Sequence, residues 1–166
     1  QAAGIHTALD TCGMVSRGQF EKVLPYTGLI LFDLKLMDPH AHQNHTGQHN
    51  ELILGNLLYV HDFIQNSSKN QHLWIRTPLI PDATDLPTNL FAIGNFLASE
   101  LNGSVERWDL CAFNNLCRDK YRRLGMTWQY NETPLYSQPQ LDERYLWAIA
   151  SPFPKEKIMI TGATRV

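Results

Sequence analysis

The sequence LILFDLK, at residues 29–35, decides how the rest of the chain is interpreted. Its first four residues are apolar and run directly into Asp33 and Lys35, which are separated by one residue. A continuous apolar run of this length is typical of a strand buried on both faces, as in a parallel sheet covered by helices. Asp33 and Lys35 then lie at the carboxyl end of the strand and point to the same side. Ligands bind at that end of parallel α/β folds, but an ion pair that only caps the strand explains these residues as well.

Polar residues also follow the other predicted strands, each at the carboxyl edge of its own strand. Together with the first pair, these residues are Asp10, Thr11, Asp33, Lys35, Arg76 and Asn114. Four consecutive strands that deliver charged or hydrogen-bonding groups to one rim favour a functional site over structural capping. Because the rim carries both signs of charge, it suits a zwitterionic ligand better than a polyphosphate. No Gly-rich phosphate loop is present in the sequence.

Helical patterns separate the predicted strands, which indicates the order β-α-β-α-β-α-β-α-β. Ser16, Asn50 and Asp85 are the expected N-caps of three of the helices. The prolines at 78 and 81 are expected to end the pairing of the third strand. Repeated βαβ units of this kind predict a parallel sheet in one α/β domain over residues 1–166.

Composition excludes several classes of protein. Of the 166 residues, 43% are apolar and 18% are charged, which is typical of a globular domain. The net charge of -2 argues against nucleic-acid and anionic-membrane binding, since both need clustered positive charge. No apolar run approaches the ~18 residues of a membrane span. The three cysteines are unevenly spaced, which favours free thiols in a reducing, cytoplasmic compartment over a disulfide framework or a zinc ribbon.

A histidine-rich stretch follows the central strand and contains His40, His42, His45 and His49. The last three would share one face of a helix. A metal site is one hypothesis, and an exposed helix that ends at Thr46 and Gly47 is the other. The second is favoured because no nearby carboxylate cluster completes a metal shell, and the role of the stretch stays open.

Several motifs together resemble a known family. They are LDTCG at 9–13, LFDLK at 31–35, the His-x-x-x-Thr-Gly pattern at 42–47, WIRTPLIP at 74–81 and KYRRLG at 120–125. In this order and spacing they resemble the C-terminal two-thirds of the glycyl radical enzyme activating enzymes, which are radical S-adenosylmethionine (SAM) proteins. The resemblance implies part of an incomplete (β/α)6 barrel, with about four parallel strands, covering helices and a short C-terminal strand.

The resemblance also implies an activity for the whole protein. In that family, SAM and a 4Fe–4S cluster generate a 5′-deoxyadenosyl radical, which takes a hydrogen atom from a glycine of a partner glycyl radical enzyme such as pyruvate formate-lyase. The electron comes from a donor such as flavodoxin or ferredoxin. The cofactor supplies the difficult chemistry and the protein positions it.

The resemblance assigns SAM binding to Asp10, Thr11, Asp33, Lys35, Arg76 and Asn114. Asp33 and Lys35 match the Asp-x-Lys motif that contacts SAM. Asp10 and Thr11 match an Asp-Thr pair near the methionyl group, where the family can also hold a monovalent cation. Asn114 stands where several members have a histidine near the ribose. Asparagine can hydrogen-bond there, but it does not titrate near neutral pH.

The cysteine loop of the family, Cys-x3-Cys-x2-Cys, and its Gly-Gly-Glu strand are expected upstream of Gln1. The chain alone is therefore expected to hold no cluster and to contain no catalytic residue, and its open side is expected to expose apolar surface. Two alternatives stay open: another radical SAM enzyme that acts on a small molecule or peptide, and a non-catalytic α/β interaction domain. The sequence does not identify the partner, since activating enzymes for several glycyl radical lyases are similar.

Overall fold

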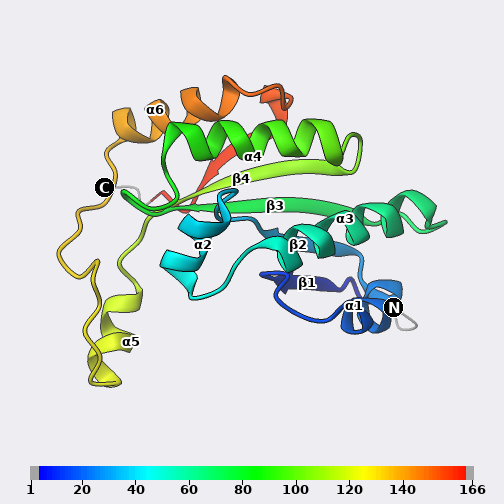
Figure 1. The fold of residues 1–166 in the computed structure, drawn as a ribbon, viewed down its shortest axis with the longest axis horizontal. Coiled ribbons are helices and arrows are strands. Elements are labelled where there is room, and N and C mark those ends of the chain that lie inside the picture. Colours follow the sequence, from blue (N-terminus) through cyan, green and yellow to red (C-terminus); the bar gives the residue numbers. More distant parts are fainter. Residues whose placement is uncertain (1–3, 164–166) are drawn as a thin grey trace.

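The computed structural model describes residues 4–163 and has a five-stranded sheet at its centre (Figure 1). Every neighbouring pair of strands is parallel, and the strands lie in sequence order across the sheet. The strands are β1 (Ala8–Thr11), β2 (Leu29–Asp33), β3 (His72–Leu79), β4 (Val105–Ala112) and β5 (Ile158–Thr161). The predicted α/β class, with four parallel strands and a short fifth one, is confirmed.

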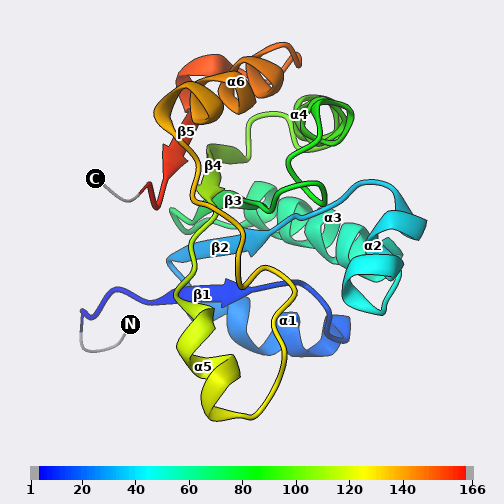
Figure 2. The ribbon, with the colours of Figure 1, turned by 90° about the vertical axis from the view of Figure 1, so that its left-hand side faces the viewer.

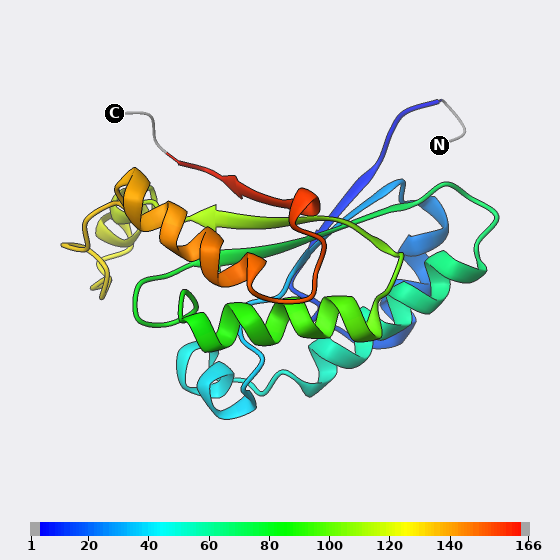
Figure 3. The same cartoon turned by 90° about the horizontal axis from the view of Figure 1, so that it is seen from above.

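Helices connect the strands and cover one face of the sheet. They are α1 (Arg17–Val23), α2 (Pro39–Thr46), α3 (Glu51–Asn66), α4 (Pro87–Glu100), α5 (Cys117–Arg123) and α6 (Gln138–Ile149), with short 3-10 turns η1 (Leu24–Tyr26) and η2 (Lys155–Lys157). Figures 2 and 3 show α1, α3, α4 and α6 on the same side of the strands, whereas α5 lies beyond the carboxyl end of the sheet. We call the opposite side the helix-free face. Within residues 4–163, no helix combines the length and apolar character needed to cross a membrane.

The hydrophobic core lies between the sheet and these helices. Ile30 and Phe32 of β2 and Leu73 and Ile75 of β3 are completely buried. Burial of each such side chain contributes about 1.5–3 kcal/mol. Because successive side chains of a strand point to opposite faces, this core fixes the register and turns the alternate residues toward the helix-free face.

The structure corrects two local predictions. Asp85 does not cap α4, because Leu86 occupies the N-cap position and Asp85 is turned into a buried network described below. Pro78 does not end β3 but lies within it, opposite Cys111 of β4. Its position is tolerated because Arg76, two residues earlier, faces β2, and β2 ends at Asp33. The missing N–H of Pro78 therefore faces a side with no strand left to pair.

The expected cap at Asn50 is only partly right. Asn50 does occupy the N-cap position of α3, but its side chain makes no capping hydrogen bond. The amide is buried and donates instead to the carbonyls of Leu36 and Met37, each at 2.9 Å. It thereby ties the start of α3 to the segment that follows β2.

Candidate functional site

Four of the predicted site residues meet at the carboxyl end of the helix-free face. Asp33 of β2 lies opposite Arg76 of β3 in the sheet register. The Arg76 guanidinium donates to Oδ1 of Asp33 from Nε at 2.9 Å and from Nη2 at 2.7 Å, and Nη2 also donates to Asp10. Lys35 Nζ lies 3.1 Å from Asp33 Oδ2. We call Asp10, Asp33, Lys35 and Arg76 the rim cluster, and it joins three consecutive strand ends as expected.

The rim cluster is charged and partly open to solvent. Its side chains are 25% exposed at Asp33, 24% at Arg76, 30% at Lys35 and 61% at Asp10. Burial lowers the pKa of the Arg76 guanidinium, but hydrogen bonds to Asp10 and Asp33 outweigh this effect and the pKa is raised. Two cations and two carboxylates balance each other. Since ion pairs this exposed contribute about 0–1 kcal/mol each, a ligand with its own charges can replace them at little cost.

Thr11 and Asn114 are not part of the hydrogen-bond network of the rim cluster. Thr11 lies opposite Phe32, whose side chain is in the core, and its hydroxyl accepts from the N–H of Gly13 at 3.0 Å. Asn114 is exposed after β4, and its side-chain oxygen accepts from the N–H of Leu116 at 3.1 Å. Both side chains shape the turns that follow their strands.

A second charged pair on the same face was not predicted. Arg107 Nε lies 2.7 Å from Asp109 Oδ1, and the guanidinium lies 4.5 Å from the centre of the Trp74 ring. Asp109 is almost fully buried and lies opposite Arg76 in the register. Alternation from Arg107 to Cys111 could have placed this pair on the helix-free face, but the irregularity between Val105 and Arg107 breaks the pattern at the start of β4.

Buried asparagines on the helices hold the loops that carry the rim cluster, and sequence reasoning also missed them. Asn56 of α3 donates to the carbonyls of Gly13 at 2.8 Å and Val15 at 2.7 Å, in the turn that follows β1. Asn89 of α4 donates to the carbonyl of Lys35 at 2.9 Å. The sequence did contain a signal for them, since each is a single polar residue on the apolar face of its helix. A buried amide at such a position needs hydrogen-bond partners.

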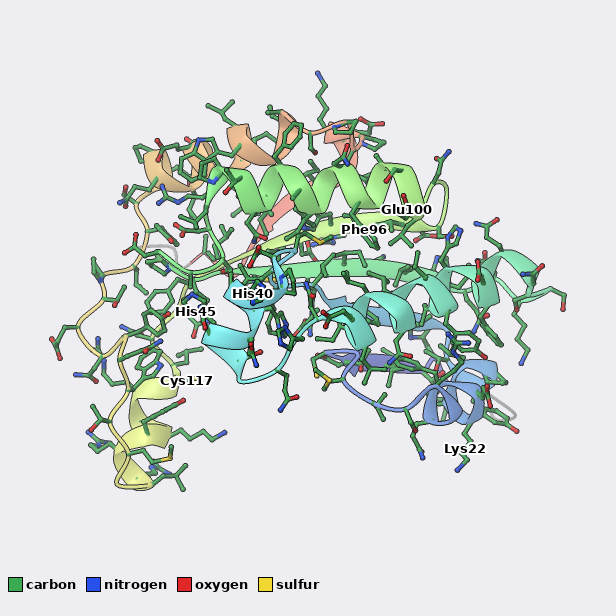
Figure 4. All side chains as sticks on the ribbon, in the orientation of Figure 1. Lys22, His40, His45, Phe96, Glu100 and Cys117 are labelled. Carbon is green, nitrogen blue, oxygen red and sulfur yellow. The ribbon has the colours of Figure 1, made fainter. Side chains whose placement is uncertain are left out.

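The histidine-rich stretch does not form the predicted shared face. α2 ends at Thr46, so His49 lies outside the helix. His42 is buried, and its Nδ1 lies 2.6 Å from the carbonyl oxygen of Gln48, which closes the turn after α2. His40 and His45, labelled in Figure 4, are exposed. Among residues 4–163, no three His, Cys, Asp or Glu side chains are arranged to hold a metal ion.

The cysteines do not fit an iron–sulfur cluster. Cys12, Cys111 and Cys117 are free thiols on three different segments. Such a cluster needs several cysteine thiolates converging on it, and no such group occurs in the part of the chain that the structure describes. Cys111 is half-buried, and burial raises the pKa of its thiol.

The chain is an α/β domain with a mixed-charge cluster at the carboxyl ends of its parallel strands, the end at which ligands bind in open α/β sheets. No protein-family model matches the chain. The chain is 33% identical over 129 residues to the (2S)-3-sulfopropanediol dehydratase activating enzyme of Klebsiella oxytoca, covering 78% of this chain and 39% of that protein. It is 32% identical over 129 residues to the pyruvate formate-lyase-activating enzyme of Streptococcus mutans, covering 74% of this chain and 46% of that one. The relatives of this chain are therefore glycyl radical enzyme activating enzymes, as the motifs predicted.

A solved structure supports the fold. A domain of a pyruvate-formate lyase-activating enzyme from Bacteroides vulgatus superposes with a TM-score of 0.71 at 24% identity, over 97% of this chain and 84% of that domain. The chain spans less than half the length of the two curated relatives described above.

Proposed function

We propose that this chain is the SAM-binding and partner-facing part of a radical SAM activating enzyme. The whole protein would use one electron from flavodoxin or ferredoxin to split SAM into methionine and a 5′-deoxyadenosyl radical. That radical would take a hydrogen atom from a glycine of a glycyl radical enzyme, leaving 5′-deoxyadenosine and a glycyl radical. The observation that carries the proposal is the rim cluster, in a chain whose relatives are activating enzymes.

The charges of the rim cluster fit SAM. The ligand carries a carboxylate, an ammonium group and a sulfonium, and the cluster offers cations and carboxylates within one network. Arg76 and Lys35 would bind its negative group, and Asp33 and Asp10 its positive ones. Thr11 and Asn114 would contact the ligand from beside the rim cluster. The oxygens of Asp10 and Thr11 would coordinate a monovalent cation.

The iron–sulfur cluster does not fit the described residues, so we assign it to a part of the protein outside them. The role of this chain is then to bind and orient SAM rather than to supply electrons. The Arg107–Asp109 pair supports this role, because it lies beside Arg76 on the same face and forms the neighbouring wall of the site. Trp74 lies against Arg107 and extends that wall with an aromatic ring.

The proposal is tested by Lys35→Ala in the full-length protein, reconstituted without oxygen. We expect reductive SAM cleavage to fall about 10- to 100-fold, because a charged hydrogen bond to the ligand is lost. Lys22→Ala, an exposed lysine on α1, is the matched control. Unchanged SAM cleavage by Lys35→Ala would show that the assigned role of Lys35 is wrong. A glycyl radical signal on an added partner separates an activating enzyme from a radical SAM enzyme that acts on small molecules.

A further inference from the structure

The segment at residues 113–131, which contains α5, stands apart from the rest of the molecule, and we call it the α5 arm. α5 has no buried residue. Figures 1 and 2 show that it projects beyond the carboxyl ends of the strands, away from the helices that cover the sheet. The rim cluster lies at the same end of the sheet. A short helix with no buried face gains little from packing, so its position needs another explanation.

The α5 arm is held in shape by its own aromatic side chains. The Trp128 ring stacks on the rings of Phe113 and Tyr121, with centres 6.0 and 5.9 Å apart. Arg118 donates to the carbonyl of Asn131 across the arm. Offset aromatic pairs contribute about 0.5–1.5 kcal/mol each. The arm is therefore organised by contacts among its own side chains, which include pairs of Asp119 with Arg122 and Arg123.

The outer surface of the α5 arm is both basic and apolar. α5 carries four basic residues and one acidic residue, in a chain whose net charge is -2. Three large apolar side chains around it are exposed: Leu116 (81%), Leu124 (60%) and Met126 (55%). Exposed large apolar side chains that lie near basic groups are a feature of surfaces that contact another macromolecule.

The arm also contains a hollow of about 480 Å³ that combines the same two kinds of group. Its lining includes Arg118, Tyr121, Arg122, Met126, Trp128 and Asn131. Guanidinium groups bind carboxylates, and the rings and the thioether accept an apolar side chain. An acidic segment that also carries an apolar residue fits this lining.

We propose that the α5 arm docks such an acidic, apolar segment of the enzyme whose glycine is oxidised. The inference rests on the proposed function and adds a place where the partner binds. The glycine has to enter the site at the carboxyl end of the strands, and the α5 arm lies at that end. A second copy of this chain is disfavoured, because a two-fold interface would bring two basic helices together.

The test uses reconstituted full-length enzyme, with pyruvate formate-lyase and (2S)-3-sulfopropanediol dehydratase as probes. Lys120→Glu should raise the apparent KM for the partner about fivefold to tenfold at low salt and leave kcat unchanged. Charges at the periphery of a protein–protein interface act on encounter and affinity rather than on the chemical step. Lys22→Glu is the matched control: both lysines are exposed in seven-residue helices. Figure 4 shows α1 at Lys22 and α5 at Cys117 on opposite sides of the molecule.

A second pair of matched variants tests the apolar part of the α5 arm. Leu124→Ala should raise the same KM, whereas Leu146→Ala on α6 should not, although the two leucines are 60% and 59% exposed. Circular dichroism checks that each variant is folded. Equal KM values for Lys120→Glu, Lys22→Glu and wild type would overturn the docking surface, as would a wild-type dimer that Lys120→Glu dissociates without changing KM. If wild type neither cleaves SAM nor forms a glycyl radical on either probe, the proposed function fails, and this outcome is distinct from an active wild type whose KM is the same in all variants.

Discussion

Two clusters in this molecule use the same Asp–Arg chemistry in opposite settings. The rim cluster joins Asp33 and Arg76 at the open end of the helix-free face, where each side chain is about one-quarter exposed. The other, which we call the anchor cluster, contains Asp85, Tyr136 and Arg144. There Asp85 is only 4% exposed and Arg144 14%. The two clusters share an Asp–Arg pair and differ in burial, which leaves the rim cluster accessible to the ligand that we propose and makes the anchor cluster a structural connection.

Both carboxylate oxygens of Asp85 accept hydrogen bonds within the anchor cluster and the loop before it. Asp85 Oδ2 accepts from the Tyr136 hydroxyl at 2.7 Å and from Arg144 Nη2 at 3.0 Å, and Oδ1 accepts from the N–H of Asp82 at 2.9 Å. The Arg144 guanidinium also lies over the Tyr136 ring at 4.7 Å. The cluster joins the loop before α4 to α6, and the two helices pack against each other. The Asp85 carboxylate is committed to holding these two parts of the chain together, although a hollow of about 530 Å³ lies beside it.

Replacement of Asp85 should give the largest change in stability. Asp85→Ala leaves a mostly buried guanidinium and a hydroxyl without their acceptor, and we expect the free energy of unfolding to fall by about 3–5 kcal/mol. The measurement is urea unfolding followed by circular dichroism. Asp10→Ala is the control from the rim cluster, and its exposed pair with Arg76 should change stability by at most about 1 kcal/mol. Similar losses for both variants would contradict the distinction between the clusters.

Replacement of Arg76 should weaken ligand binding strongly and change stability little, the reverse of what we expect for Asp85. Arg76→Lys keeps the charge but removes the planar group that bonds Asp10 and Asp33 together. We expect SAM binding by the reconstituted full-length enzyme to weaken about tenfold, with a change in unfolding free energy below about 1 kcal/mol. Isothermal titration calorimetry and urea unfolding measure the two quantities. A stability loss as large as that of Asp85→Ala would make the rim cluster structural.

The rim cluster could be predicted from sequence, and the anchor cluster could not. Asp33 and Lys35 follow an apolar strand directly, so the period of the strand and its position in the sheet fix where both side chains point. Asp85 precedes a helix with a proline in its first turn, a pattern that also favours an N-cap, and this led to the wrong prediction. Its partner Arg144 lies 59 residues away, and no local rule pairs the two.

The same reasoning explains the other differences. The order of strands and helices was predictable because each element carries its own period. The asparagines at 56 and 89 were not, since each bonds to a backbone segment more than 40 residues distant. Pro78 misled the prediction because its tolerance depends on where the neighbouring strand ends. Local sequence patterns therefore predicted the strands, the helices and the rim cluster. The anchor cluster and the buried asparagines depend on contacts between distant parts of the chain, which local patterns do not show.

The pH dependence of stability gives a smaller expected effect, which we assign to Tyr136 of the anchor cluster. Burial and the hydrogen bond to Asp85 raise the pKa of Tyr136 above its usual value near 10. The folded state then keeps a proton that the unfolded state loses, so the stabilisation is complete below about pH 10 and is lost as the pH rises further. Wild type should lose stability more steeply than Tyr136→Phe between about pH 10 and 11. Parallel curves in urea unfolding would contradict the assignment.

The smallest expected effect tests how open the helix-free face is away from the rim cluster. Cys111 is half-buried on β4, and the Thr161 hydroxyl lies 3.6 Å from its sulfur. Because burial raises the pKa of this thiol, its thiolate fraction at pH 8 is small, and iodoacetamide should modify it more slowly than the exposed Cys12 and Cys117. Peptide mapping by mass spectrometry at several times gives the three rates. If Cys111 reacts as fast as Cys12, the face is as open at β4 as at β1, and the exposure that distinguishes the rim cluster would extend across the whole sheet.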